Sequence, residues 1–334
     1  MGKTGWSTNK KRGQSRNKYS RIELNDQFKQ ALDIMEHTSK NVFITGRAGT
    51  GKSTLLEYFR NTTKKKVVVL APTGVAALNI KGQTIHSFFR FKPCIIPDRV
   101  KKLRSSNDNE SVYRKLDAIV IDEISMVRAD LLDCVDRFLR LNGPEADKPF
   151  GGIQMAFIGD LYQLPPVITS GEKTVFQSLY ETPYFYGAWV FDSLDMEFVE
   201  MEKIYRQHDE QFITLLNGIR NNSISEEYLK LLNRRCQPEF EPPPDDFCVY
   251  LTTTNRLAEE INIRRLAELM SRLYTFTGNI EGDFGREYLP TAIDLQVKVG
   301  AQVMMLNNDT EGRWVNGSIG KITGQNQRYL SQYP

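Results

Sequence analysis

The sequence contains few of the residues that bind metals or form disulfide bonds. It has only three histidines, and its four cysteines, Cys94, Cys134, Cys236 and Cys248, are widely separated with no C-x-x-C spacing. This pattern indicates neither a zinc site nor a disulfide framework, and it is typical of a reducing compartment. We therefore expect a cytoplasmic location.

Long apolar segments are missing as well. The N-terminal residues lack the apolar stretch of a secretory signal peptide, and Trp6 stands where a myristoylation signal has Ser or Thr. No apolar run reaches the length that spans a bilayer, and we find no internal repeat and no low-complexity segment. We therefore expect no membrane partner.

Length and composition predict a globular protein with about two domains. The chain has 334 residues, of which 40% are hydrophobic and 25% are charged. The formal net charge is only +3, but residues 1–21 contain several Lys and Arg and no acid. Residues 1–23 are therefore either a segment that lies on nucleic acid or a solvated, disordered basic leader.

The strongest local pattern lies at residues 46–53. They match the phosphate-binding pattern G-x-x-x-x-G-K-[ST], between an apolar strand at 41–45 and a helix that follows. Glycines let backbone N–H groups point at a phosphate, and the helix start adds a partial positive charge. Lys52 would reach the β- and γ-phosphates, and the Ser53 hydroxyl would hold Mg²⁺. The residues expected to bind the nucleotide are Gly46, Gly49, Thr50, Gly51, Lys52, Ser53 and Thr54.

The surrounding segments predict an α/β fold. Further apolar strands are expected at 66–70, 118–121 and 155–160, and an insertion at 92–116. A helix is expected at 25–36, with Asn25 as its N-cap and a buried face of Phe28, Ala31, Leu32 and Met35. A second helix is expected near 129–141, and its inward side chains are Leu131, Leu132, Val135, Phe138 and Leu139. Near-continuous apolar strands that alternate with helices indicate a parallel sheet that is covered on both faces. Ligands of such sheets bind outside the carboxyl ends of the strands.

Polar residues follow these strands and suit the hydrolysis of a nucleotide. Asp122 can hold Mg²⁺, and Glu123 can orient and deprotonate the attacking water. Gln163 can contact the γ-phosphate or that water, and Arg206 can reach the γ-phosphate as an arginine finger. The alternatives are a polar loop residue for Gln163 and a surface ion pair for Arg206.

A second unit is expected from about residue 205. Helices are expected near 209–219, 225–235 and 256–268, and a strand at 248–251. Antiparallel strands are expected at 303–306 and 319–322, with Asn316-Gly317 as a hairpin turn signal.

Two clusters at strand-to-helix junctions are candidates for DNA contacts. Pro72 and Thr73 in the first unit have counterparts in Thr253 and Asn255 in the second. Each cluster offers a hydroxyl and helix-start N–H groups to a backbone phosphate, or else is an ordinary helix cap. His86 could meet a nucleotide. Phe88 and Phe89 either stack on bases or form a buried aromatic cluster.

The order of these motifs resembles that of a known family. The segments are GRAGTGKSTLL, VVVLAPTGVAALNIKGQTIHSFF, IVIDEISMV, FGGIQMAFIGDLYQLPPV, IYRQ, LTTTNRLAEEIN and VKVGAQVMMLNND. From about Leu24 to Ile322 the chain is similar to the bacterial branch of the Pif-one (petite integration frequency) DNA helicases of superfamily 1B.

The resemblance implies a fold, an activity and partners. It implies a RecA-like domain at 24–204, a partial second one at 205–334 and an SH3-like β segment at about 293–325. It also implies ATP, Mg²⁺, 5′-to-3′ movement on single-stranded DNA, action at duplex junctions and association with the bacterial nucleoid. Gln27 matches the glutamine that such helicases place against adenine.

The family pattern continues beyond the point at which this chain stops. We therefore expect nucleotide binding to be stronger than unwinding, and an ATP- and DNA-binding protein that no longer unwinds is the alternative to an ATP-dependent helicase. A phosphoryl-transfer kinase is a third class. Asp122-Glu123 together with Gln163 argues against a kinase, because both suit the activation of water.

Overall fold

The computed structural model describes most of the chain and divides it into two compact units, residues 1–229 and 230–334. The described residues are 25–92, 95–103, 110–169, 171–205, 209–243, 246–279, 291–306, 309, 311, 313–314 and 317–324. The expected basic leader at 1–23 lies outside them.

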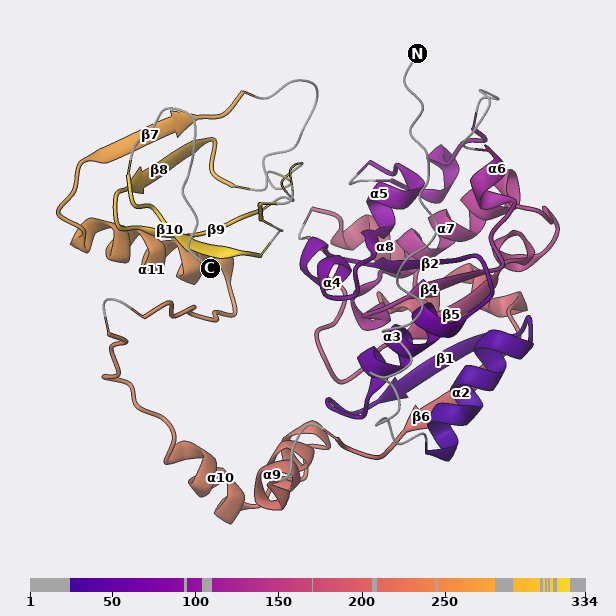
Figure 1. The fold of residues 1–334 in the computed structure, drawn as a ribbon, viewed down its shortest axis with the longest axis horizontal. Coiled ribbons are helices and arrows are strands. Elements are labelled where there is room, and N and C mark those ends of the chain that lie inside the picture. Colours follow the sequence, from indigo (N-terminus) through magenta and orange to yellow (C-terminus); the bar gives the residue numbers. More distant parts are fainter. Residues whose placement is uncertain are drawn as a thin grey trace. The chain divides into compact units, whose positions relative to one another are not determined.

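Unit 1 is built on a six-stranded sheet with the strand order β3-β2-β4-β5-β1-β6, in which every neighbouring pair is parallel (Figure 1). The strands are β1 (Asn41–Gly46), β2 (Val67–Ala71), β3 (Gln83–Thr84), β4 (Ala118–Ile121), β5 (Gln154–Ile158) and β6 (Met196–Met201). The predicted α/β class with a parallel sheet is confirmed, and so are the four predicted strands.

Alternate residues of the strands build two hydrophobic cores, one on each face of the sheet. Along β1, Val42 and Ile44 pack with the core that contains α2 and α3, whereas Phe43 packs with the core that contains α5 and α7. Burial on both faces explains why these strands are almost entirely apolar in sequence.

The helices cover this sheet and connect its strands. The α-helices are α2 (Asp26–His37), α3 (Lys52–Thr62), α4 (Gly74–Asn79), α5 (Ile85–Phe89), α6 (Glu110–Tyr113), α7 (Ala129–Asn142), α8 (Lys173–Leu179) and α9 (Glu210–Arg220). Short 3-10 helices are η1 (Pro97–Arg99), η2 (Ile124–Met126), η3 (Pro149–Gly152), η4 (Phe185–Gly187) and η5 (Trp189–Ser193). Helix α10 (Glu226–Asn233) crosses the boundary between the two units.

Helix α2 shows how closely the local signals determine an element. The Asn25 side chain accepts a hydrogen bond from the Phe28 N–H at 2.8 Å, which is the predicted N-cap. The buried face differs in one position from the expected one, because Ile34 is buried and Leu32 is only partly covered. The helix therefore begins where the sequence predicts and is rotated slightly from the expected orientation.

Unit 2 contains α11 (Asn255–Glu268) and two antiparallel strand pairs. β7 (Leu273–Thr277) pairs with β8 (Asp294–Lys298), and β9 (Gln302–Met304) pairs with β10 (Ile319–Lys321). The β9–β10 pair confirms the expected antiparallel strands. Gly317 of the expected turn has φ +87°, and Asn316 lies outside the described residues.

The strand predicted at 248–251 is wrong. These residues have no regular structure, and Leu251 is 94% exposed. A parallel strand needs neighbouring strands to satisfy its backbone groups. Within the described part of unit 2, the strands pair only with each other.

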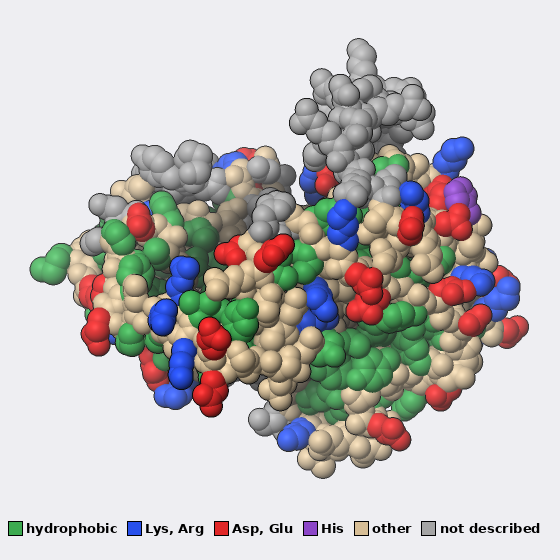
Figure 2. Space-filling view, turned by 90° about the horizontal axis from the view of Figure 1, so that it is seen from below, with side chains coloured by type: hydrophobic (Ala, Val, Ile, Leu, Met, Phe, Trp, Pro, Cys, Tyr) green, Lys and Arg blue, Asp and Glu red, His purple; other side chains and the backbone are tan. Residues whose placement is uncertain are grey.

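The surface drawn in Figure 2 carries both signs of charge. Lys and Arg side chains are interspersed with Asp and Glu on this face. On this face the mixed charges produce no strong field of one sign, so anion binding there depends on local geometry. Among the described helices, none combines the length and apolarity that crossing a bilayer requires.

Candidate active site

The phosphate loop joins β1 to α3 at the carboxyl edge of the sheet. Gly51 has φ +95° and is the N-cap of α3, with the Leu55 N–H bonded to its carbonyl at 2.8 Å. Gly46 is required by close approach, since a Cβ atom there would lie 2.4 Å from the Met201 carbonyl oxygen. The loop is thus fixed by glycine conformations at both of its ends.

Lys52 lies at the centre of this loop. Its ammonium donates to the carbonyl oxygens of Gly46 at 2.6 Å and Arg47 at 3.0 Å. Burial lowers the pKa of Lys52, and the nearby charges of Asp160 and Glu123 oppose that effect. A partly buried ammonium near several acids is well placed to bind an anionic ligand that a metal ion accompanies.

The other loop residues divide into buried and exposed groups. Thr50 is 1% exposed, and its hydroxyl donates to the Arg47 carbonyl at 2.9 Å, so it holds the loop closed. Ser53 and Thr54, in the first turn of α3, are exposed. Their positions therefore leave both hydroxyls accessible to a ligand.

Asp122 and Glu123 directly follow β4, two strands from β1 in the sheet. Asp122 is 8% exposed, and burial raises its pKa to about 6. Glu123 has φ +52°, a left-handed conformation that is strained for a residue with a side chain. Such strain is often found at functional sites, where the surrounding structure holds it in place.

These residues fit a magnesium ion that a nucleotide brings with it. No group of three or more His, Cys, Asp or Glu side chains in the described chain is arranged to hold a metal. Mg²⁺ on a nucleotide usually needs only one or two carboxylates in addition to phosphate oxygens and water. The Asp122 carboxylate and the Ser53 hydroxyl provide such a set. A bound cation would stabilise the charged form of the buried Asp122 carboxylate.

Gln163 lies just after β5 and is hydrogen-bonded to a buried acid at the end of that strand. Asp160 follows β5, and its carboxylate accepts hydrogen bonds from Gln163 Nε2 at 3.2 Å and from the Arg220 guanidinium. Asp160 and Arg220 were not among the predicted site residues. The acid at a strand end was a visible signal, whereas Arg220 lies 60 residues away in sequence and carries no local pattern.

The segment after β6 contacts the phosphate loop. Gln27 Nε2 donates to Glu202 Oε2 at 3.2 Å, and the Tyr205 N–H donates to the Gly49 carbonyl at 2.8 Å. Gln27 is therefore joined to a strand end that itself touches the phosphate loop. Arg206, the next residue, lies outside the described residues.

The candidate DNA residues lie at helix starts. Thr73 is the N-cap of α4, and its side chain accepts from the Ala76 N–H at 3.2 Å. In unit 2 the corresponding cap is Thr254, which lies between Thr253 and Asn255 and accepts from the Leu257 N–H at 3.3 Å.

The other candidates of this group lie close to α4 in sequence. Pro72 precedes the Thr73 cap and is partly exposed. His86 is the second residue of α5 and is also partly exposed. Both therefore remain accessible to a ligand.

The aromatic residues beside His86 belong to the core. Phe89 is 2% exposed and stacks on Phe91 and Tyr113, while Phe88 packs edge-on against Phe89 and Tyr113. This is the buried aromatic cluster that was the alternative to base stacking.

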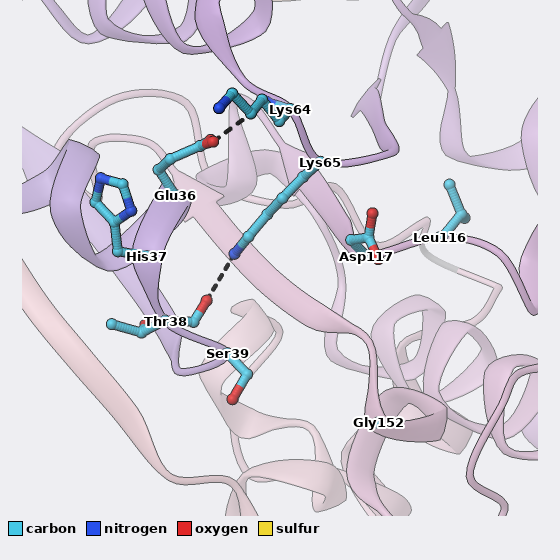
Figure 3. A pocket seen from close by; sticks show the side chains of 9 residues that line it. All are labelled: Glu36, His37, Thr38, Ser39, Lys64, Lys65, Leu116, Asp117 and Gly152. Atoms are coloured by element: carbon cyan, nitrogen blue, oxygen red, sulfur yellow. Dashed lines mark hydrogen bonds between the residues drawn. The ribbon is translucent and has the colours of Figure 1, made fainter.

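A cavity of about 550 Å³ lies at the opposite edge of the sheet from the phosphate loop (Figure 3). Its lining residues directly precede the strands, as Lys64 and Lys65 precede β2 and Asp117 precedes β4. Lys65 Nζ donates to the carbonyls of Met35 and Thr38, both at 2.6 Å, so this ammonium is already hydrogen-bonded within the protein. The cavity is therefore separate from the phosphate loop and from the acids at the carboxyl ends of the strands.

Comparison with known proteins identifies the family. A family model described as PIF1-like helicase matches residues 23–229. The chain belongs to the PIF1-like helicase family. Its relatives include the ATP-dependent DNA helicase Pif1 of Bdellovibrio bacteriovorus, 32% identical over 90% of this chain and 67% of the relative. The ATP-dependent DNA helicase PIF1 of Saccharomyces cerevisiae is 35% identical over 88% of this chain and 35% of the relative.

Solved structures of the PIF1-like helicase family match both the sequence and the fold. The Pif1 helicase from Bacteroides in complex with ADP-AlF3 and single-stranded DNA has a TM-score of 0.79 and 35% identity, over 91% of this chain and 71% of that one. The RecA-like P-loop fold expected for the sheet is thus confirmed. The chain spans well under two thirds of several of the family's curated members, with 42% of yeast RRM3 and 35% of yeast PIF1 covered.

These relatives are all called ATP-dependent DNA helicases.

Proposed function

We propose that this chain is an ATP-dependent DNA helicase whose phosphate loop and neighbouring strand ends hydrolyse ATP. The observation that carries the proposal is geometric. In the sheet, β4, β5 and β1 are consecutive parallel strands, and their carboxyl ends carry Asp122 and Glu123, Asp160, and the phosphate loop with Lys52. A phosphate-binding lysine thus lies at the same edge of the sheet as the acids that metal binding and water activation require.

Each residue has a distinct role in the reaction. The loop N–H groups and Lys52 bind the β- and γ-phosphates, and the charge of Lys52 grows in importance as negative charge develops in the transition state. Ser53 and Asp122 would hold Mg²⁺, which would screen the phosphate charge. Glu123 orients a water for attack on the γ-phosphate and accepts its proton.

Two further groups complete the hydrolysis site. Gln163 hydrogen-bonds the attacking water or the γ-phosphate, and Arg206 neutralises charge on the γ-phosphate as an arginine finger. Gln27 contacts the adenine base. Its hydrogen bond to Glu202 supports that role, because Glu202 starts the segment that reaches Gly49.

The DNA substrate is proposed from the family's structures and from the chain's own helix caps. One related structure contains single-stranded DNA and another concerns forked double-stranded DNA. Thr73 and the 253–255 segment lie at helix starts in the two units, where N–H groups suit a backbone phosphate. We propose movement in the 5′-to-3′ direction on single-stranded DNA, with entry at duplex junctions.

Strand displacement with matched substrates tests this proposal. Two partial duplexes with the same paired sequence carry either a 5′ or a 3′ single-stranded tail. We expect ATP-dependent displacement of the 5′-tailed substrate only, together with release of inorganic phosphate. Phosphate transfer to an acceptor without free phosphate would support a kinase instead. DNA binding and hydrolysis without displacement would support the non-unwinding alternative.

A further inference from the structure

A buried ion pair lies beside the phosphate loop, and the roles proposed above leave it unexplained. The Asp160 side chain is 1% exposed and pairs with the Arg220 guanidinium, whose side chain is 17% exposed. The same carboxylate oxygen accepts the Gln163 amide at 3.2 Å. The other oxygen accepts the Tyr162 N–H at 3.1 Å. One acid thus orders the residues that follow β5.

Arg220 contacts this segment in two ways. Besides the ion pair, its guanidinium carbon lies 4.2 Å from the centre of the Tyr162 ring. A planar guanidinium that is held between a carboxylate and an aromatic face has little freedom to turn. Helix α9, which ends at Arg220, is therefore attached to the segment that carries Gln163.

The ion pair belongs to the phosphate end of the site. The charge of Asp160 raises the pKa of Lys52, and the charge of Arg220 lowers it. Together they add little net charge where the phosphates bind. Asp160 alone would add a buried negative charge beside an anionic ligand, which is costly.

We propose that Arg220 is a positioning residue for ATP hydrolysis that holds Gln163 through the shared Asp160 carboxylate. The Gln163 amide nitrogen donates to Asp160, which leaves the amide oxygen of the same group to accept a hydrogen bond from the attacking water. The inference rests on the proposed function, since it gives Gln163 the role of orienting the attacking water.

Amide hydrogen exchange on the full chain without nucleotide tests the contact itself. The Tyr162 N–H donates to the Asp160 carboxylate and the Gln163 N–H to the Asp160 backbone carbonyl. Loss of the ion pair in Arg220→Gln should therefore loosen this turn and accelerate exchange in residues 160–167. Arg137→Gln is the matched control, because Arg137 forms an exposed pair with Asp98 at 3.3 Å elsewhere in unit 1. If Arg220→Gln unfolds the unit, exchange rises throughout, and Arg220→Lys replaces it.

Steady-state hydrolysis tests the positioning role. Arg220→Gln should lower kcat by about 10²-fold with little change in KM for ATP, because a misplaced group affects the chemical step. Arg220→Lys should recover part of the loss. Arg220→Gln combined with Gln163→Ala should be no slower than Gln163→Ala alone, because the two act as one unit.

The outcomes separate this inference from the proposed function. A wild-type chain that releases no phosphate contradicts the proposed function, and the exchange measurement still decides whether Arg220 orders the Gln163 segment. Unchanged exchange in Arg220→Gln, or a double variant whose losses multiply, overturns the positioning role.

Discussion

At the scale of single residues, Lys52 carries the largest share of the proposed chemistry. Its ammonium is partly buried and donates to two loop carbonyls, and truncation of the side chain removes its charge. We expect Lys52→Ala to abolish ATP hydrolysis and to weaken nucleotide binding. Fluorescent-nucleotide titration and phosphate release measure the two effects. Lys148→Ala, which removes a lysine with a 62% exposed side chain, is the control. Unchanged turnover in Lys52→Ala would remove the phosphate loop from the mechanism.

Gly46 tests the geometry of the loop, independently of charge. An added Cβ would lie 2.4 Å from the Met201 carbonyl oxygen and 2.9 Å from Thr50 Oγ1, both of which are held in place. Gly46→Ala should therefore lower the free energy of unfolding by about 1–3 kcal/mol and weaken nucleotide binding. Gly171→Ala, where no atom lies within 4 Å of the added Cβ, should be neutral in chemical denaturation. Equal stability of the two variants would contradict the close approach of β1 and β6.

At the scale of elements, the amino ends of the strands are held together by a polar network. Gln154 is 3% exposed and donates to the carbonyls of Ile34 at 3.0 Å and Lys40 at 2.6 Å, while it accepts from Lys65 Nζ at 2.7 Å. These bonds join β5, α2 and the start of β2.

Gln154→Leu should separate stability from nucleotide binding. Leaving the bonded groups without partners should reduce the free energy of unfolding by about 1–3 kcal/mol. Nucleotide affinity should not change, because the network lies at the edge of the sheet opposite the phosphate loop. Urea denaturation and nucleotide titration of the same sample measure both quantities. A loss of nucleotide affinity without a loss of stability would contradict this prediction.

Elements with strong local signals could be predicted from the sequence. The phosphate loop, the N-cap of α2 and the buried face of α7 all depend on residues within a few positions of each other. β6 was not predicted because its sequence alternates, with Glu197 and Glu200 among the apolar residues, as an edge strand allows. β3 has only two residues and no pattern.

Contacts between distant segments could not be predicted. The pairing of Asp160 with Arg220 and of Tyr205 with Gly49 depends on how the chain returns to the sheet, which no local period specifies. The apolar run at 248–251 shows the opposite error. A strand needs neighbours to pair with, and an apolar sequence alone does not provide them.

At the scale of the whole molecule, DNA binding should depend strongly on salt. Contacts to phosphates release counterions, with a slope of about −0.7 per contact on a single strand in a plot of log affinity against log salt. The sequence at 1–21 is basic and contains no acid. Deleting residues 1–20 should make this negative slope, measured by fluorescence anisotropy, less steep. Changing only the Lys and Arg of this segment to Gln should have the same effect, and an identical slope in both variants would make the segment a bystander.

The central claim is that the strand-end acids turn a phosphate-binding loop into an ATP hydrolysis site. Release of inorganic phosphate in the presence of single-stranded DNA, compared between the wild-type chain and Glu123→Gln, tests it most directly. We expect DNA-stimulated release by the wild type, and a rate lower by about 10²–10⁴-fold in Glu123→Gln with nucleotide binding retained. Equal rates in the two proteins, or nucleotide binding that falls as much as the rate, would contradict the account.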